Sequence, residues 1–121
     1  MTPKETAKLT THVLDTSLGR PAANLSLALW RVEGEQRAKV VDAVTNADGR
    51  CDSPLLAGES FLPGVYELVF AAGTYFDRLG LFLPQPKFLD EVVIRFGLAE
   101  PTHYHVPLLL SPFGYSTYRG S

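Results

Sequence analysis

Apolar residues alternate with polar or small residues in several short segments of the chain. Leucine recurs at every second position in residues 25–29, and residues 65–70 and 92–96 repeat the same period of two. Such alternation places one set of side chains on each face of a β-strand. We therefore predict strands near the following residues: 8–14, 25–33, 38–46, 57–61 (a short edge strand), 64–71, 91–97, 102–110 and 114–119.

Turn residues separate these segments, as in Asn46-Ala47-Asp48-Gly49 and Pro63-Gly64. Short strands at this spacing predict an all-β sandwich of seven to eight strands. One segment differs, because Thr74 and Asp77 have the spacing of a capping box and Gly80 can supply a left-handed stop. We therefore expect one short helix near 74–80.

The run from Val106 to Leu110 is apolar at every position, so both faces of its strand need cover. A sandwich covers only one face, and a partner subunit would cover the other. Pro107 cannot donate to a strand ladder, which predicts an edge or a bulge at this point. The run therefore indicates self-association beside an irregular strand.

Composition narrows the class of protein. The 121 residues suit a single domain, expected at 8–121 after a flexible N-terminus at 1–7, and 45% of them are hydrophobic. The net charge of −2 gives no basic surface for nucleic acid or anionic lipid. No apolar run is long enough to span a membrane, and the polar N-terminus lacks a secretory signal. With one cysteine and hence no internal disulfide, we expect a cytoplasmic protein.

The chain has three histidines, His12, His103 and His105. Positions two apart on a strand share a face, so His103 and His105 point the same way. If Val13 faces the core, His12 faces outward, and the two segments can meet at one surface. Three interpretations stay open: a three-histidine zinc site, metal-free acid–base chemistry, and ordinary half-buried strand residues.

Three other features bear on a site. Cys51 follows Arg50, and a neighbouring cation can depress a thiol pKa, although a lone cysteine is more often inert. The rigid fork of Arg50 suits a planar anion, although an arginine near a turn is usually solvated. The closing residues 118–121 would by default be a frayed tail.

Three separated motifs carry a family resemblance that covers nearly the whole chain. They are the opening Leu9-Thr10-Thr11-His12-Val13-Leu14-Asp15-Thr16, the turn Thr45-Asn46-Ala47-Asp48-Gly49-Arg50, and the segment from His103 through Ser111-Pro112-Phe113-Gly114-Tyr115 to Tyr118-Arg119-Gly120-Ser121. Together they resemble the 5-hydroxyisourate hydrolases, and the closing tetrapeptide distinguishes these enzymes from transthyretin proper.

The resemblance implies a transthyretin-like sandwich and a set of site residues. It assigns His12, Arg50 and His105 to catalysis, with His12 and Arg50 also contacting the substrate. From the closing tetrapeptide it adds Ser121 to catalysis and Tyr118 to substrate binding. His103 also matches the family, but we assign it no direct chemical role. The resemblance also implies a homotetramer, built as a dimer of dimers with sites in the channel between dimers.

The implied reaction is hydrolysis of 5-hydroxyisourate in urate degradation, giving 2-oxo-4-hydroxy-4-carboxy-5-ureidoimidazoline without a metal or organic cofactor. A neutral histidine can act as base and then protonate the leaving nitrogen, and Arg50 can stabilise the oxyanion. The sequence leaves open which histidine activates the water, and we favour His12 assisted by His105. The alternatives are a transthyretin-type small-ligand binding protein and a three-histidine zinc hydrolase.

Overall fold

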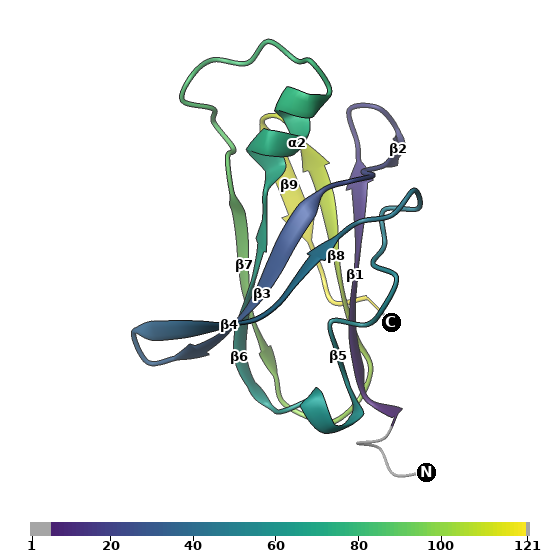
Figure 1. The fold of residues 1–121 in the computed structure, drawn as a ribbon, viewed down its shortest axis with the longest axis vertical. Helices are drawn as coiled ribbons and strands as arrows, with labels where there is room; N and C mark the ends of the chain where they lie inside the picture. The colour runs from purple at the N-terminus through teal and green to yellow at the C-terminus, as the bar shows by residue number, and fades with distance from the viewer. Residues whose placement is uncertain (1–5, 121) are drawn as a thin grey trace.

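The computed structural model describes residues 6–120 as two packed β-sheets with one α-helix (Figure 1). In chain order the elements are β1 (Lys8–Asp15), β2 (Arg20–Pro21), β3 (Ser26–Glu33), β4 (Gln36–Val44), β5 (Leu56–Ala57), the 3₁₀ turn η1 (Gly58–Ser60), β6 (Gly64–Phe70), α2 (Ala72–Arg78), β7 (Val92–Leu98), β8 (Tyr104–Ser111) and β9 (Gly114–Thr117).

The first sheet has the order β2-β1-β8-β9, with β5 also pairing with β1. The second has the order β4-β3-β6-β7. All pairs are antiparallel except β1 and β8, which run parallel although they lie near opposite ends of the chain. The predicted all-β, transthyretin-like sandwich with one short helix is therefore confirmed.

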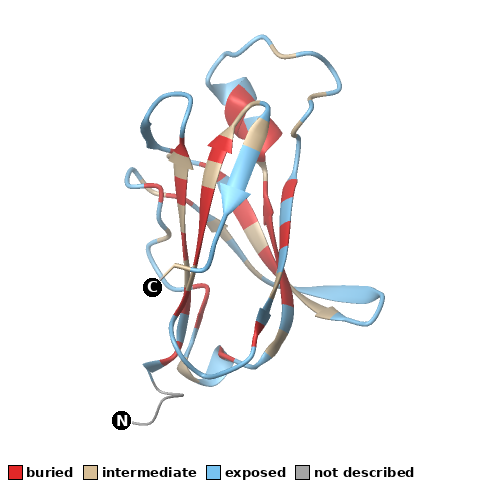
Figure 2. Cartoon of the chain, turned by 180° about the vertical axis from the view of Figure 1, so that it is seen from behind, coloured by how far each residue is buried: buried red, intermediate tan, exposed pale blue. Residues whose placement is uncertain are grey.

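Alternation decides which side chains of β1 and β8 face outward, strictly along β1 and with one exception along β8, where Pro107 is also buried. Leu9, Thr11 and Val13 of β1 are buried, and so are Val106 and Leu108 of β8. These residues face the core between the sheets, and the positions between them in β1 are only half-buried. Figure 2 views this sheet from the other side, with buried and intermediate segments along β1 and β8 and mostly exposed residues on β9. The period of two thus turns His12 and His105 outward.

The helix begins earlier than expected and the predicted capping box is wrong. Thr74 lies inside α2, whose N-cap residue, Ala71, makes no side-chain cap hydrogen bond. Instead the amide of Gly73 donates to the carbonyl of Asp90 (2.7 Å), and a Cβ at Gly73 would overlap the Asp90 carboxylate. The loop before β7 therefore takes the place of a side-chain cap. The expected stop is present, since Gly80 has a φ of +79°.

Two further expectations need correction. The edge strand expected at 57–61 is only the two residues of β5, followed by the 3₁₀ turn η1. Pro107 lies in an interior strand, not at a sheet edge, because β8 runs between β1 and β9. The strand tolerates it because pairing with β9 begins only at Leu108, and the Pro107 carbonyl accepts a hydrogen bond from the Thr117 hydroxyl (2.7 Å).

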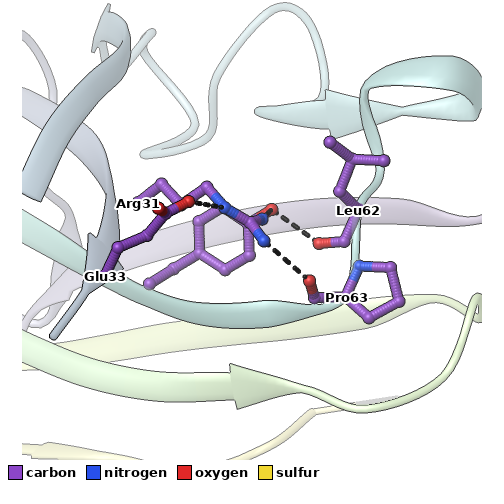
Figure 3. A network of polar contacts seen from close by, with 5 residues as sticks. Arg31, Glu33, Leu62 and Pro63 are labelled. Carbon is purple, nitrogen blue, oxygen red and sulfur yellow. Dashed lines mark hydrogen bonds and ion pairs between the residues drawn. The ribbon is translucent and has the colours of Figure 1, made fainter.

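A polar network joins the start of β6 to the outer end of β3 (Figure 3). The Arg31 guanidinium donates to Glu33 (3.2 Å) and to the Pro63 carbonyl (3.1 Å). It also donates to the Tyr66 hydroxyl (2.7 Å), which in turn donates to the Leu62 carbonyl (2.6 Å). These bonds anchor the loop before β6 at the end of the second sheet.

The ends of the chain lie partly outside the described residues. Of the N-terminal segment expected to be flexible, residues 1–5 are outside, and Ala7 is fully buried. Within residues 6–120, no helix is long and apolar enough to cross a membrane.

Asp15 at the end of β1 is a buried carboxylate whose charge is met by four donors. It accepts from the Tyr75 hydroxyl (2.7 Å), the Ser17 hydroxyl (2.5 Å) and the amides of Ser17 (3.0 Å) and Leu18 (3.1 Å). Burial raises the pKa of Asp15, but these hydrogen bonds outweigh it, and the pKa lies below its ordinary 3.8. The charged form therefore stabilises the fold above the unfolded-state pKa.

We expect this stabilisation to disappear as the pH falls from about 4 through the depressed pKa of Asp15. Asp15→Asn should lower the free energy of unfolding at neutral pH by about 1–3 kcal/mol and flatten its loss in acid. Urea unfolding at several pH values measures both effects. Asp42→Asn, on the mostly exposed strand β4, is the matched control. An equal loss of unfolding free energy in that variant would contradict the role given to Asp15.

Candidate active site

A cavity of about 530 Å³ opens on the outward face of β1 and β8, a size typical of small-molecule sites. Its lining comes from the first sheet, the turn after β4 and the segment after β9. The polar residues that line it include Thr10, His12, Arg50, His103, His105 and Tyr118. No Asp or Glu is among its described lining residues, and among them Arg50 alone carries a fixed charge.

The parallel pairing of β1 and β8 brings the histidines together. Thr10 is in register with His105, and His12 is in register with Pro107. In parallel strands, residues in register share a face, so His12 and His105 lie on neighbouring strands of one face, offset by two positions. In the structure the two distant histidine segments lie side by side on one surface, as predicted.

Arg50 reaches this face because the turn before it is held against β1. The Asn46 side-chain oxygen accepts from the amides of Asp48 (2.9 Å) and Arg50 (3.2 Å), which closes the turn. Gly49 has a φ of +75°, and its carbonyl accepts from the Val13 amide (2.8 Å). A Cβ at Gly49 would overlap the Val13 carbonyl, so only glycine allows this approach. The backbone of Arg50 consequently pairs with that of His12 in an isolated antiparallel β-bridge.

The same arginine shapes the electrostatics of both histidines. Burial lowers the pKa of His12 below 6.5, and the positive charge of Arg50 lowers it further, against a smaller opposite effect from Asp48. For His105, burial again lowers the pKa, followed by the charges of Arg50, His12 and His103. Both imidazoles are therefore neutral at pH 7, which is the form a general base needs.

The Arg50 guanidinium makes no hydrogen bond or ion pair with another residue in the range 6–120, although its side chain lines the cavity. A guanidinium in this position is available for an anionic ligand or an oxyanion. His12, Arg50 and His105 thus combine two bases with a fixed positive charge.

One residue of this face was not singled out from the sequence. The Thr10 hydroxyl lies 2.8 Å from Nδ1 of His105 and 3.0 Å from Nε2 of His103. Thr10 stands two positions before His12, which places it on the outward face, but its partner histidines depend on the parallel pairing of β1 and β8. No local signal predicts that pairing.

The segment after β9 closes one side of the cavity. Tyr118 lines it, and the Arg119 guanidinium stacks on the ring of Tyr104, 4.1 Å from its centroid. The Gly120 amide donates to the His105 carbonyl (2.7 Å), and a Cβ there would lie 2.8 Å from Cδ2 of His105. The described part of the tail therefore packs on β8, whereas the expected site residue Ser121 lies outside the described residues.

Cys51 also lines the cavity, but its environment is opposite to the one considered from the sequence. Burial raises the pKa of its thiol, and the charge of Asp52 raises it further. The suggestion that Arg50 depresses this pKa is therefore wrong. Between residues 6 and 120, no group of three His, Cys, Asp or Glu side chains is arranged to hold a metal ion.

These features define a class of protein, a transthyretin-type sandwich whose outer sheet face carries a histidine and arginine site. The chain belongs to the HIUase/Transthyretin family, whose model matches residues 9–120. It is 64% identical over 114 residues to the 5-hydroxyisourate hydrolase of Mesorhizobium japonicum, covering 94% of this chain and 92% of that protein.

Two solved structures are similar in fold and sequence. The 5-hydroxyisourate hydrolase of Klebsiella pneumoniae has a TM-score of 0.77 and 36% identity, covering 95% of this chain and 94% of that one. (S)-allantoin synthase has a TM-score of 0.89 and 46% identity over 97% of this chain. This chain spans only 45% of the synthase chain.

Proposed function

We propose that this chain hydrolyses 5-hydroxyisourate to 2-oxo-4-hydroxy-4-carboxy-5-ureidoimidazoline, a step in urate degradation. The observation that carries the proposal is the convergence of two neutral imidazoles and the Arg50 guanidinium on one cavity. The proposal is supported by the 64% identity to a protein with that activity in its name. Both the residues and the relatives favour the same reaction.

The chemistry requires an attacking water, a stabilised oxyanion and an acid for the leaving nitrogen. A neutral imidazole takes a proton from water as its oxygen attacks the ring carbonyl carbon, and Arg50 stabilises the negative oxygen. When the carbon–nitrogen bond breaks, the proton goes to the departing nitrogen. The product is therefore the substrate plus one water, formed as a carboxylic acid that releases its proton to solvent near neutral pH.

His12 and His105 are the acid–base groups of this proposal, with His12 and Arg50 also contacting the substrate. Tyr118 would contact the substrate from the tail, and Ser121 would complete the site. The mechanism uses no metal or organic cofactor.

The test is to generate 5-hydroxyisourate in the cuvette with urate oxidase and to follow its absorbance decay. We expect this protein to accelerate the decay far beyond the spontaneous rate, and to keep doing so after dialysis against a chelator. Activity lost on chelation and restored by zinc would favour a zinc hydrolase. Saturable binding of small ligands without any turnover would instead favour the transthyretin-type binding protein.

We also propose that the chain forms a homotetramer in the cytoplasm. Leu109 lies on the outward face of β8, and the rings of Phe88 and Phe113, 6.2 Å apart, are 71% and 62% exposed. Exposed apolar groups of this kind are typical of surfaces that a second subunit covers. Light scattering should give a mass near four times 13.3 kDa. A stable monomer with full activity would contradict the tetramer.

A further inference from the structure

The Thr10 hydroxyl bridges two histidines, only one of which has a role in the proposed reaction. Its oxygen is 2.8 Å from Nδ1 of His105 and 3.0 Å from Nε2 of His103. A hydroxyl has one proton and two acceptor sites, so it donates to at most one of these nitrogens and can accept a hydrogen bond from the other. The two imidazoles are therefore coupled through one oxygen.

Two arrangements of the neutral rings run both hydrogen bonds in one direction through the hydroxyl, as proton transfer requires. In the first, Nδ1–H of His105 donates to Thr10, and Thr10 donates to Nε2 of His103. In the second, both bonds run the other way, and the proton of His105 is on Nε2. The first leaves Nε2 of His105 unprotonated and able to act as a base, whereas the second makes the same atom an acid.

We propose that Thr10 and His103 are positioning residues, which set the tautomer of His105 and exchange a proton with it during hydrolysis. The proposal rests on the proposed function. His105 lines the cavity, and its Nε2 makes no hydrogen bond with any residue in the range 6–120. We assign the first arrangement to the resting state, because it leaves Nε2 unprotonated and available to the attacking water. His105 then takes the proton from water, and His12, the acid–base group beside Arg50, assists it.

The proton route balances over one turnover. Nε2 of His105 takes the proton from water, Nδ1–H passes its proton to Thr10, and Thr10 passes its own proton to Nε2 of His103. His103 then holds the positive charge while the tetrahedral intermediate exists. When the carbon–nitrogen bond breaks, the three transfers reverse, and Nε2 of His105 protonates the departing nitrogen.

The location of each group explains why the charge would move. Arg50, His12 and His103 all disfavour a positive charge on His105, and burial disfavours it most. His103 is exposed, so water can solvate an imidazolium there. Transfer through Thr10 thereby keeps a second cation away from Arg50 and from the substrate. Chains of hydrogen bonds through a hydroxyl are suited to such transfers.

The first test compares Thr10→Val, which keeps the shape of the side chain without the hydroxyl, with Thr10→Ser, which keeps the hydroxyl. We expect Thr10→Val to lower kcat by about 10-fold to 100-fold with little change in KM, a range typical when a partner that orients a histidine is lost. Thr10→Ser should restore kcat to within a few-fold of the wild type. Wild-type kcat in Thr10→Val, or equal loss in both variants, would overturn the proposal.

His103→Gln separates proton transfer from positioning, because its amide can accept the Thr10 hydrogen bond but cannot hold the proton. We expect its kcat to fall while KM is kept, and an unchanged kcat would overturn the transfer step. A wild-type protein without hydrolase activity would overturn the proposed function itself, and this inference with it. An active wild type with an unaffected Thr10→Val would overturn the inference alone.

Nitrogen-15 NMR of the histidines gives a readout that does not depend on turnover. In the wild type at neutral pH we expect His105 to have Nδ1 protonated and Nε2 unprotonated, the less common tautomer of a free imidazole. Thr10→Val should lose this preference, and Thr10→Ser should keep it. A wild-type His105 protonated on Nε2 would contradict the assigned resting state, even if Thr10→Val does not fold.

Discussion

Replacing His12 or His105 by alanine should slow the turnover of 5-hydroxyisourate by about 10²–10⁴-fold, the range typical of a general acid–base group. Arg50→Ala should slow it by about 10²–10³-fold, because the oxyanion would lose its positive partner. All three side chains line the cavity and none belongs to the buried core, so the variants should remain folded. Steady-state kinetics measures the loss of turnover, and circular dichroism checks that the variants remain folded.

Cys51→Ala is the matched control, since its side chain lines the same cavity and the raised pKa of its thiol makes it a poor nucleophile. We expect its kcat to stay within a few-fold of the wild type. A near-normal rate in either histidine variant would return that histidine to an ordinary strand residue. A collapse in Cys51→Ala would instead indicate a thiol nucleophile.

The second large effect is expected at the tail. The Cβ of Gly120→Val would lie against the His105 ring, where even a bare Cβ is 2.8 Å from Cδ2. Either the ring or the tail must then move, and a displacement near 1 Å can cost about 10²-fold in rate. Deleting residues 118–121 removes Tyr118 from the cavity together with the proposed group at Ser121. Residues appended after Ser121 should also reduce hydrolysis sharply, by crowding the proposed site.

These changes are compared with an N-terminal tag before Met1, which should leave kcat unchanged because residues 1–7 carry no site motif. All forms should keep the oligomeric state of the parent protein. Equal kcat in the Gly120→Val, C-terminally tagged and untagged proteins would mean that the tail is an ordinary frayed end. Tyr118 and Ser121 would then leave the proposed site.

The strands and their inward faces could be predicted because they depend on local alternation. Leu27, Leu29 and Val13 are buried, as period two requires. The start of α2 could not be predicted, since the Gly73 amide in its first turn donates to Asp90, which lies well beyond the end of the helix in the sequence. The error at Pro107 has the same origin, because its tolerance depends on where β9 begins to pair with β8.

The site shows the same division. His12 and His105 could be placed on outward faces from alternation, and the resemblance supplied Arg50 and Tyr118, all of which line one cavity. Thr10 was missed because its importance comes from the register of two parallel strands that are distant in sequence. The direction of the Cys51 pKa was misjudged because burial is its largest cause, whereas the sequence showed only that Arg50 is the neighbouring residue.

The central claim is that a neutral histidine beside Arg50 is the base, and the pH dependence of kcat/KM tests it most directly. Protonation of the histidines should abolish hydrolysis as the pH falls, and because burial and Arg50 depress the pKa of His12 and His105, the midpoint should lie below 6.5. In Arg50→Ala the midpoint of this loss in the residual activity should move to higher pH, because the charge of Arg50 no longer lowers the pKa of the histidines. A rate that rises as the pH is lowered, or a midpoint that does not move in Arg50→Ala, would contradict the account.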